Sequence, residues 1–332
     1  IGVTVNTSVT VGKYDPDTFA KYQKEYGQGY GPFYGSGPGA GFLSGDINGD
    51  GDADLVVPTT EDASYGSAFD PNLLVYGWES LYPALDTYQQ AMPYVAGAND
   101  PSYIFQTSYT DIENVSVTTG GEQGSTRISY TRFNQTGIMP NSEINRNTLD
   151  FSGTLNITDK LTASAKAIYT KTNGLGRYGT GYDAENLMTN FRQWWAVNTD
   201  LAAQRDAYFS TGRNITWNPY GPDNLDAIYW DNPYFTRYEN YNNDERNRLF
   251  GYTTLGYEFT DWFDVQGRVS VDSYSTIREE RNNVGSVDIA NYTRRNINFA
   301  EFNYDLFLNF DQDFGDFGLN ATLGTNYRQT TV

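Results

Sequence analysis

The stretch EFNYDLFLNF, residues 301–310, decides the fold class of this chain. Phe302, Tyr304, Leu306, Leu308 and Phe310 occupy every second position, and Glu, Asn or Asp fill all but one of the others. Because successive side chains of a β-strand point to opposite faces, this alternation predicts a strand with one apolar and one polar face.

Eight other segments show the same period, four of them more loosely. The nine expected strands lie at about residues 1–11, 113–119, 125–135, 147–157, 161–172, 247–259, 263–272, 299–310 and 317–329. So many alternating segments predict an all-β protein built on an antiparallel sheet.

The connections between these strands alternate strictly in length. The short turns lie at 120–124, 158–160, 260–262 and 311–316. The long connections lie at roughly 12–112, 136–146, 173–246 and 273–298. An outer-membrane barrel has short periplasmic turns and long external loops, whereas a soluble sandwich has no reason to keep this parity. The sequence therefore predicts a transmembrane antiparallel β-barrel with extracellular long loops.

The expected strand number is odd, although bacterial single-chain barrels have even numbers of strands. Strands with unpaired edges are unstable in lipid, where every backbone polar group needs a partner. The chain also begins at Ile1, inside an expected strand, with no visible signal peptide. We therefore expect this to be the N-terminal portion of a barrel that further sequence completes, in preference to completion by a second chain.

Composition excludes several kinds of function. The 332 residues include no Cys and no His and have a formal net charge of -19. Thiolate metal sites, thiol nucleophiles and a Ser-His-Asp triad are therefore impossible within the chain, and we do not expect an enzyme. The acidic balance argues against nucleic acid as a partner. No run of about 18 apolar residues exists, so we expect no membrane-spanning helix.

The two longest connections are expected to contain short helices, because loops of this length usually have secondary structure of their own. Asp15-Pro16 starts a helical pattern over 16–26, with Gly27 just beyond its end. A second helical pattern covers 183–209, with Leu187 and Phe191 along one face.

An acidic loop in the first long connection, DINGDGDAD at residues 46–54, has the spacing of a calcium site. Asp46, Asn48, Asp50 and Asp54 are expected to offer side-chain oxygens, and Asp52 its backbone carbonyl. Hard oxygen ligands at such positions, with a Gly that permits a sharp turn, suit Ca²⁺. The glutamate of an EF-hand is missing from the twelfth position, so a solvated acidic turn is the alternative.

Aromatic residues supply the other candidate sites. The third long connection contains Trp194, Trp195, Trp217 and Trp230. These four could contact a substrate or a lid protein, or they could pack the loops onto each other. Trp262, Phe263 and Phe314 flank short turns and are expected to lie in the aromatic belt at the membrane interface.

Several motifs resemble SusC/RagA-type TonB-dependent transporters. They are NQTGIMPNS at 134–142, LNITDKLT at 155–162, WDNPY at 230–234, DERNR at 244–248 and EFNYD at 301–305. The resemblance implies a plug domain followed by a 22-stranded barrel, of which this chain would be about the first nine strands without the plug. It also implies contact with the TonB complex through the missing N-terminal region, and a SusD-like surface lipoprotein on the external loops.

The expected function is therefore TonB-dependent import of a glycan or peptide nutrient across the outer membrane. Two alternatives stay open at the level of sequence. The first is a passive porin or a structural barrel without energy coupling. The second is a soluble, calcium-stabilised, carbohydrate-binding β-protein.

Overall fold

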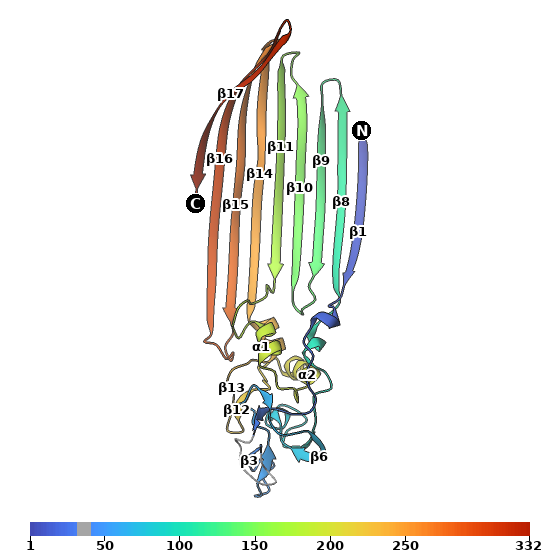
Figure 1. Cartoon of the computed structure of the whole chain (residues 1–332), viewed down its shortest axis with the longest axis vertical. Coiled ribbons are helices and arrows are strands. Elements are labelled where there is room, and N and C mark those ends of the chain that lie inside the picture. Colours follow the sequence, from blue (N-terminus) through green and yellow to red (C-terminus); the bar gives the residue numbers. More distant parts are fainter. Residues whose placement is uncertain (32–40) are drawn as a thin grey trace.

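The computed structural model describes residues 1–31 and 41–332. Its main feature is one antiparallel sheet in which each long strand pairs with the next long strand along the chain (Figure 1). In order, these strands are β1 (Gly2–Gly12), β8 (Ser108–Gly121), β9 (Gly124–Thr136), β10 (Glu143–Asn156), β11 (Leu161–Leu175), β14 (Tyr241–Thr260), β15 (Phe263–Asn282), β16 (Asn291–Phe314) and β17 (Phe317–Thr331). The predicted nine-stranded antiparallel sheet is confirmed.

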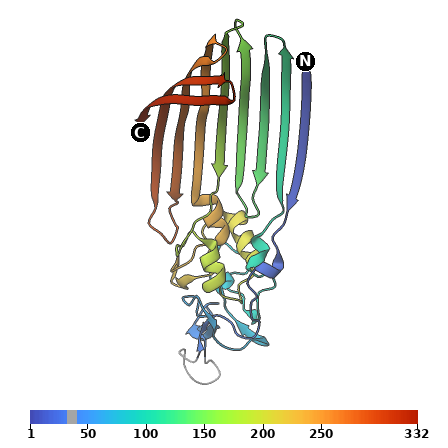
Figure 2. The same cartoon turned by 45° about the horizontal axis from the view of Figure 1, so that its top comes forward.

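β1 and β17 form the two edges of this sheet. Within the described residues neither strand has a second partner, so the sheet is open and is not closed into a barrel. Figure 2 shows the β16–β17 hairpin folding forward over one face of the sheet. No helix among the described residues is long and apolar enough to cross a membrane.

The strand register places like residues together across the sheet. Val5 lies opposite Val115, and Leu308 lies opposite both Val265 and Leu323. A slip of one residue would move every apolar side chain of a strand to the other face, so the alternation in the sequence fixes this register.

All four short turns lie at one end of the sheet and all four long connections at the other (Figure 1). The β16–β17 turn consists of Gly315 and Asp316, and Gly315 has φ of 67°. A tight hairpin turn needs positive φ at a central residue, which glycine adopts without strain.

Several strands continue well past the end of the apolar alternation. β15 reaches Asn282 and β16 begins at Asn291, where the expected strands covered 263–272 and 299–310. In this extension polar pairs such as Glu279 opposite Arg294 are interspersed with apolar residues such as Ile277 and Ile297, so the strict alternation is lost. The backbone ladder continues there without an apolar pattern that could reveal it.

The long connections fold together into what we call the loop cluster, comprising residues 13–31, 41–107, 137–142, 176–240 and 283–290. It contains the helices α1 (Leu187–Gln193), α2 (Leu201–Thr211) and α3 (Pro233–Glu239). Its small strands are β2 (Gly29–Tyr30), β3 (Leu43–Gly45), β4 (Asp54–Val56), β5 (Ser64–Tyr65), β6 (Asp70–Val75), β7 (Met92–Tyr94), β12 (Pro219–Gly221) and β13 (Asn224–Ala227). The main buried apolar core, which includes Trp78, Phe191 and Trp217, belongs to this cluster.

The prediction of a helix over residues 16–26 is wrong. Only a 3₁₀ turn, Pro16–Thr18, forms there, capped by the Asp15 side chain. Beyond it, the Gln23 side chain accepts hydrogen bonds from the amides of Glu25 and Tyr26 and donates to Ser64. These tertiary and local bonds replace the helical ones.

The helix expected over 183–209 is two helices, α1 and α2, separated by residues 194–200. Asp200 ends this interruption, because its side chain accepts hydrogen bonds from the backbone amides of Ala202 and Ala203 and so caps α2. The intervening residues Trp195 and Ala196 are buried, and burial of this extended segment outweighs its helical pattern.

Candidate functional site

The two faces of the sheet have opposite chemistry. One face presents a continuous apolar band that crosses all nine strands. Members of the band are exposed to solvent in this chain, among them Val5, Val117, Leu149, Leu255 and Leu306. In β11 the band runs from Leu161 to Tyr169, which is about 27 Å along the strand. That is of the same order as the apolar belt of an outer-membrane barrel, about 25 Å tall.

Aromatic side chains border the band at both ends. Beside the short turns, the Phe263 ring stacks on Phe310 at 4.7 Å, and Trp262 lies 6.3 Å from Phe310. At the end nearest the loop cluster, the hydroxyl of Tyr130 donates to Asn147 at 2.6 Å and that of Tyr169 donates to Asn247 at 2.9 Å.

Such rings suit the boundary between lipid and water, because one end is apolar and the other can hydrogen-bond. The expected belt residues Trp262 and Phe263 lie in the first of these clusters. Phe314 adjoins the next short turn and is 62% exposed. Their place in a membrane interface stays a prediction.

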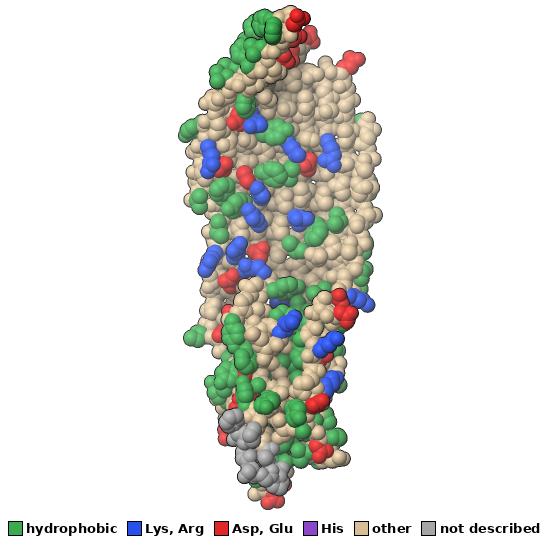
Figure 3. Space-filling model, in the orientation of Figure 1, with side chains coloured by type: hydrophobic (Ala, Val, Ile, Leu, Met, Phe, Trp, Pro, Cys, Tyr) green, Lys and Arg blue, Asp and Glu red, His purple; other side chains and the backbone are tan. Residues whose placement is uncertain are grey.

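The opposite face of the sheet is polar and ion-paired (Figure 3). Four arginine–carboxylate pairs cross between neighbouring strands. They are Arg127–Asp150 at 3.4 Å, Arg248–Asp272 at 2.6 Å, Arg268–Asp305 at 2.9 Å and Arg328–Glu301 at 3.1 Å. Charged side chains that pair with each other suit an interior wall in contact with water, because they need not be transferred into lipid or into a dry core.

The WDNPY segment acts as a junction of the loop cluster. Asp231 accepts hydrogen bonds from Asn214 at 2.6 Å and from the amide of Val287 at 2.7 Å, and it also binds Ser286. It thereby joins the connection between β15 and β16 to the third long connection. Burial raises the pKa of Asp231, and these donors act in the opposite direction.

The other residues of this segment are structural as well. Asn232 caps α3 and donates to the carbonyls of Gln204 and Ile215. Pro233 stands at the first helical position, where its missing N–H has no consequence. The indole of Trp230 donates to Asp62 at 3.1 Å.

Arg237 is a second junction, which sequence reasoning missed. Its side chain donates to the carbonyls of Pro140, Asn141 and Gly176, and so ties α3 to the GIMPNS loop and to the end of β11. Burial lowers the pKa of Arg237. The only signal in the sequence is a basic residue amid the aromatics of a short helix, which does not reveal its partners.

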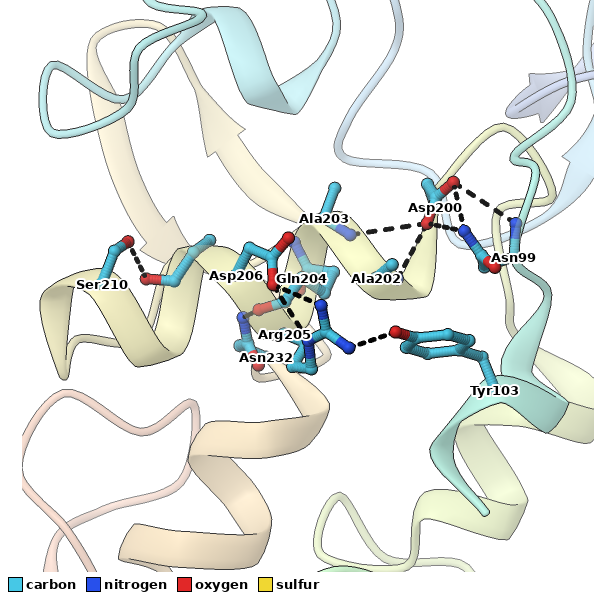
Figure 4. A network of polar contacts seen from close by, with 11 residues as sticks. Asn99, Tyr103, Asp200, Ala202, Ala203, Gln204, Arg205, Asp206, Ser210 and Asn232 are labelled. Carbon is cyan, nitrogen blue, oxygen red and sulfur yellow. Dashed lines mark hydrogen bonds and ion pairs between the residues drawn. The ribbon is translucent and has the colours of Figure 1, made fainter. Parts of the chain in front are cut away.

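A polar network attaches the first long connection to α2 (Figure 4). The Asn99 amide donates to both carboxylate oxygens of Asp200 at 3.0 Å. Arg205 binds Asp206 at 2.8 Å and also the hydroxyl of Tyr103. The network therefore joins two segments of the loop cluster that lie far apart in sequence, Asn99 and Asp200 being separated by 101 positions.

Three of the four candidate tryptophans lie in the core of the loop cluster. Trp217 is 0% exposed and its ring lies 5.3 Å from that of Trp195, while Trp230 is also buried. Trp194 is partly buried against the same core. These positions favour packing of the loops over direct contact with a substrate.

The acidic loop 46–54 is folded around its own backbone amides. Asp46 accepts from Gly49 at 2.7 Å and from Gly51 at 3.1 Å, and Asp54 accepts from Ile47 at 2.8 Å. The bond from the Asp52 amide lowers the pKa of Asp50. In residues 1–31 and 41–332, no group of three or more acidic side chains is gathered closely enough to hold a metal ion.

These features define a class of fold, namely a long antiparallel sheet with one apolar and one polar face and a loop cluster at one end. Solved structures with this fold are chains of the RagAB peptide transporter, or peptide importer. The "closed-closed" state matches at a TM-score of 0.58 and 15% identity, over 99% of this chain and 34% of that chain. The "open-open" state matches at 0.57 and 14%, with the same coverage.

A further RagAB structure matches at a TM-score of 0.53 and 15% identity, over 76% of this chain and 28% of that chain. The present chain thus spans about a third of the length of the chains that it matches. No family model matches the sequence, and a search of curated proteins finds no match. At these identities the similarity shows the fold.

Proposed function

We propose that this chain is part of an outer-membrane β-barrel that imports a nutrient. In this arrangement the apolar face contacts lipid, the polar face lines the interior, and the loop cluster lies outside the cell. The observation that carries the proposal is the pairing of a continuous apolar band with an ion-paired opposite face on one sheet. Further strands would pair with the free edges of β1 and β17 and close the barrel.

Three neighbouring residues of β15 test which face meets lipid. These 332 residues contain no Cys, so each variant adds a single thiol to this part of the protein, and the complete protein without the substitution serves as the blank for labelling. In outer membranes that contain the complete protein, a water-soluble maleimide is expected to label Ser270→Cys. It should leave Val269→Cys and Val271→Cys unlabelled, and a lipid-soluble maleimide should label these two.

A protein recovered from the aqueous fraction without detergent would contradict the barrel and favour the soluble alternative. Equal labelling of all three positions by the water-soluble reagent would show that neither face of the sheet contacts lipid at β15.

We propose further that import is TonB-dependent and that a SusD-like surface lipoprotein covers the loop cluster. The substrate class is a glycan or a peptide, and the structures of similar fold, which are peptide importers, favour a peptide. The chain would act as a transporter and not as an enzyme.

Uptake by cells separates active import from a passive porin. Cells with the complete protein are expected to accumulate labelled oligopeptides, and dissipating the proton gradient should abolish this accumulation. A gene deletion is the control. Uptake that survives the uncoupler unchanged would identify a porin.

We also propose that loop 46–54 binds Ca²⁺ through Asp46, Asn48, Asp50 and Asp54, with the Asp52 carbonyl. The donor set is all oxygen, as calcium prefers, and each carboxylate oxygen retains a lone pair beside its amide bond. The side chains would have to move toward one another around the ion, because they do not converge in this structure.

Calorimetric titration of the chelator-treated complete protein should show one calcium ion bound. Asp46→Asn should abolish this calcium binding. Asp316→Asn, in a short turn at the opposite end of the sheet, is the matched control and should bind as the unchanged protein does. No calcium binding at about 1 mM, the dissociation constant of the weakest protein calcium sites, would exclude the site.

A further inference from the structure

A separate cavity opens in the loop cluster where three connections meet, close to Arg237. It has a volume of about 350 Å³. Phe105, Ile138, Met139 and Met188 form much of its apolar wall. A cavity at the small end of the range for ligand sites accommodates one compact group and not an extended chain.

Arg237 lines this cavity and is only 6% exposed. Its Nε lies 3.0 Å from the carbonyl of Pro140, and its Nη2 lies 2.8 Å from that of Gly176 and 3.3 Å from that of Asn141. All of these acceptors are neutral. Across residues 1–31 and 41–332, no carboxylate forms an ion pair with Arg237, whose side-chain hydrogen bonds are donated by Nε and Nη2.

A buried cation without an acidic partner is unusual, because burial removes hydration that only an opposite charge replaces well. The guanidinium stays protonated even when buried, so the charge cannot be relieved by loss of a proton. The Tyr178 ring, centred 5.3 Å from the guanidinium carbon, supplies a cation–π contact but no negative charge. The cavity therefore offers an anion a positive charge beside an apolar wall.

We propose that this cavity binds a carboxylate attached to a compact apolar side chain, with the carboxylate on Arg237 and the side chain against Met188 and Ile138. This is the chemistry of the last residue of a peptide and of a free N-acyl amino acid. A planar guanidinium and a carboxylate match in charge and in geometry. The biological role of such a site rests on the proposed import function, but binding itself does not.

Glu185 also lines the cavity and sets a second condition. Asn242 donates to its carboxylate at 3.2 Å. Burial raises the pKa of Glu185, and nearby Asp183 contributes in the same direction. A bound carboxylate is repelled by Glu185 when it is ionised, so Glu185→Gln should strengthen binding while keeping an acceptor for Asn242.

The experiment measures binding of N-acetyl-leucine and of its isosteric amide, N-acetyl-leucinamide, to the purified complete protein. The acid is expected to bind about tenfold more tightly than the amide, which is a modest value for one charge-assisted contact. Arg237→Gln should remove this preference. Glu185→Gln should strengthen binding of the acid alone.

Since Arg237 also ties loops together, its variant could fail to fold. Met188→Trp provides a second arm, because it fills the cavity without touching the Arg237 hydrogen bonds, and it should abolish binding of both probes. Equal binding of acid and amide, or no binding of either at about 10 mM, would overturn the proposal.

The peptide Ala-Ala-Leu distinguishes the two sources of this chemistry. Tighter binding of the peptide than of N-acetyl-leucine assigns the cavity to peptide ends, and the reverse order assigns it to free acyl amino acids. Binding without uptake in cells would contradict the import function alone, and uptake without binding would contradict the cavity alone.

Discussion

Replacing Leu306 by Arg is expected to lower the free energy of unfolding in lipid by about 2–4 kcal/mol. Leu306 lies in the middle of the apolar alternation of β16, between Phe302 and Phe310, and is 46% exposed on the apolar face. Its neighbours across the sheet are Gly267 and Thr325, which offer no acidic partner. An arginine there would have to be dehydrated by the hydrocarbon or would have to distort the bilayer.

The measurement is urea-induced unfolding of the complete protein in vesicles. Ser270→Arg on the adjacent strand β15 is the matched control, because Ser270 lies on the polar face opposite Asn303. The same added charge should there change the stability by less than about 1 kcal/mol, as for an exposed surface charge. Equal losses for the two variants would mean that the faces do not meet different solvents.

Trp217→Ala is expected to destabilise the loop cluster by about 3–5 kcal/mol, as for a large aromatic removed from a well-packed core. Trp217 is 0% exposed and packs on Trp195, which in turn packs on Phe191 at 5.3 Å. In the described residues the Trp217 indole N–H has no hydrogen-bond partner. The loss of stability should therefore come from lost packing and from the cavity left behind. No hydrogen-bonding group loses its partner.

Because the buried core belongs to the loop cluster and not to the sheet, the effect should be local. Hydrogen exchange is expected to speed up in residues 176–240, while the sheet strands keep their protection. Trp262→Ala, at the short-turn end, is the control and should leave exchange in the loop cluster unchanged. Equal acceleration throughout the sheet would show that the sheet and the loop cluster unfold as one unit.

The strands and their two faces could be predicted from the sequence because the signal is local. Alternation in residues 301–310 depends only on neighbours two positions apart, and the same is true of the other strands. The parity of the connections is equally visible, and the structure places all the long connections at one end. The motifs that resemble SusC/RagA transporters could be read in order, although the structural comparison shows a shared fold and no more.

The loop cluster could not be predicted in this way, because contacts between distant residues decide it. Asn141 and Arg237 are 96 positions apart, and only the fold brings the carbonyl of one to the guanidinium of the other. The same applies to Asp231, whose partner Ser286 lies 55 positions away. The break between α1 and α2 also follows from the burial of Trp195 against a core that the helical pattern does not reveal.

Sequence by itself therefore determined the number and order of the long strands, the chemistry of each face and the alternation of short and long connections, since backbone geometry converts local periodicity directly into faces. Only the tertiary structure decided which tryptophans are buried, which polar residues join the loops, and where a buried arginine is left beside a cavity. These depend on desolvation and on long-range hydrogen bonds, whose partners are defined only when the chain has folded.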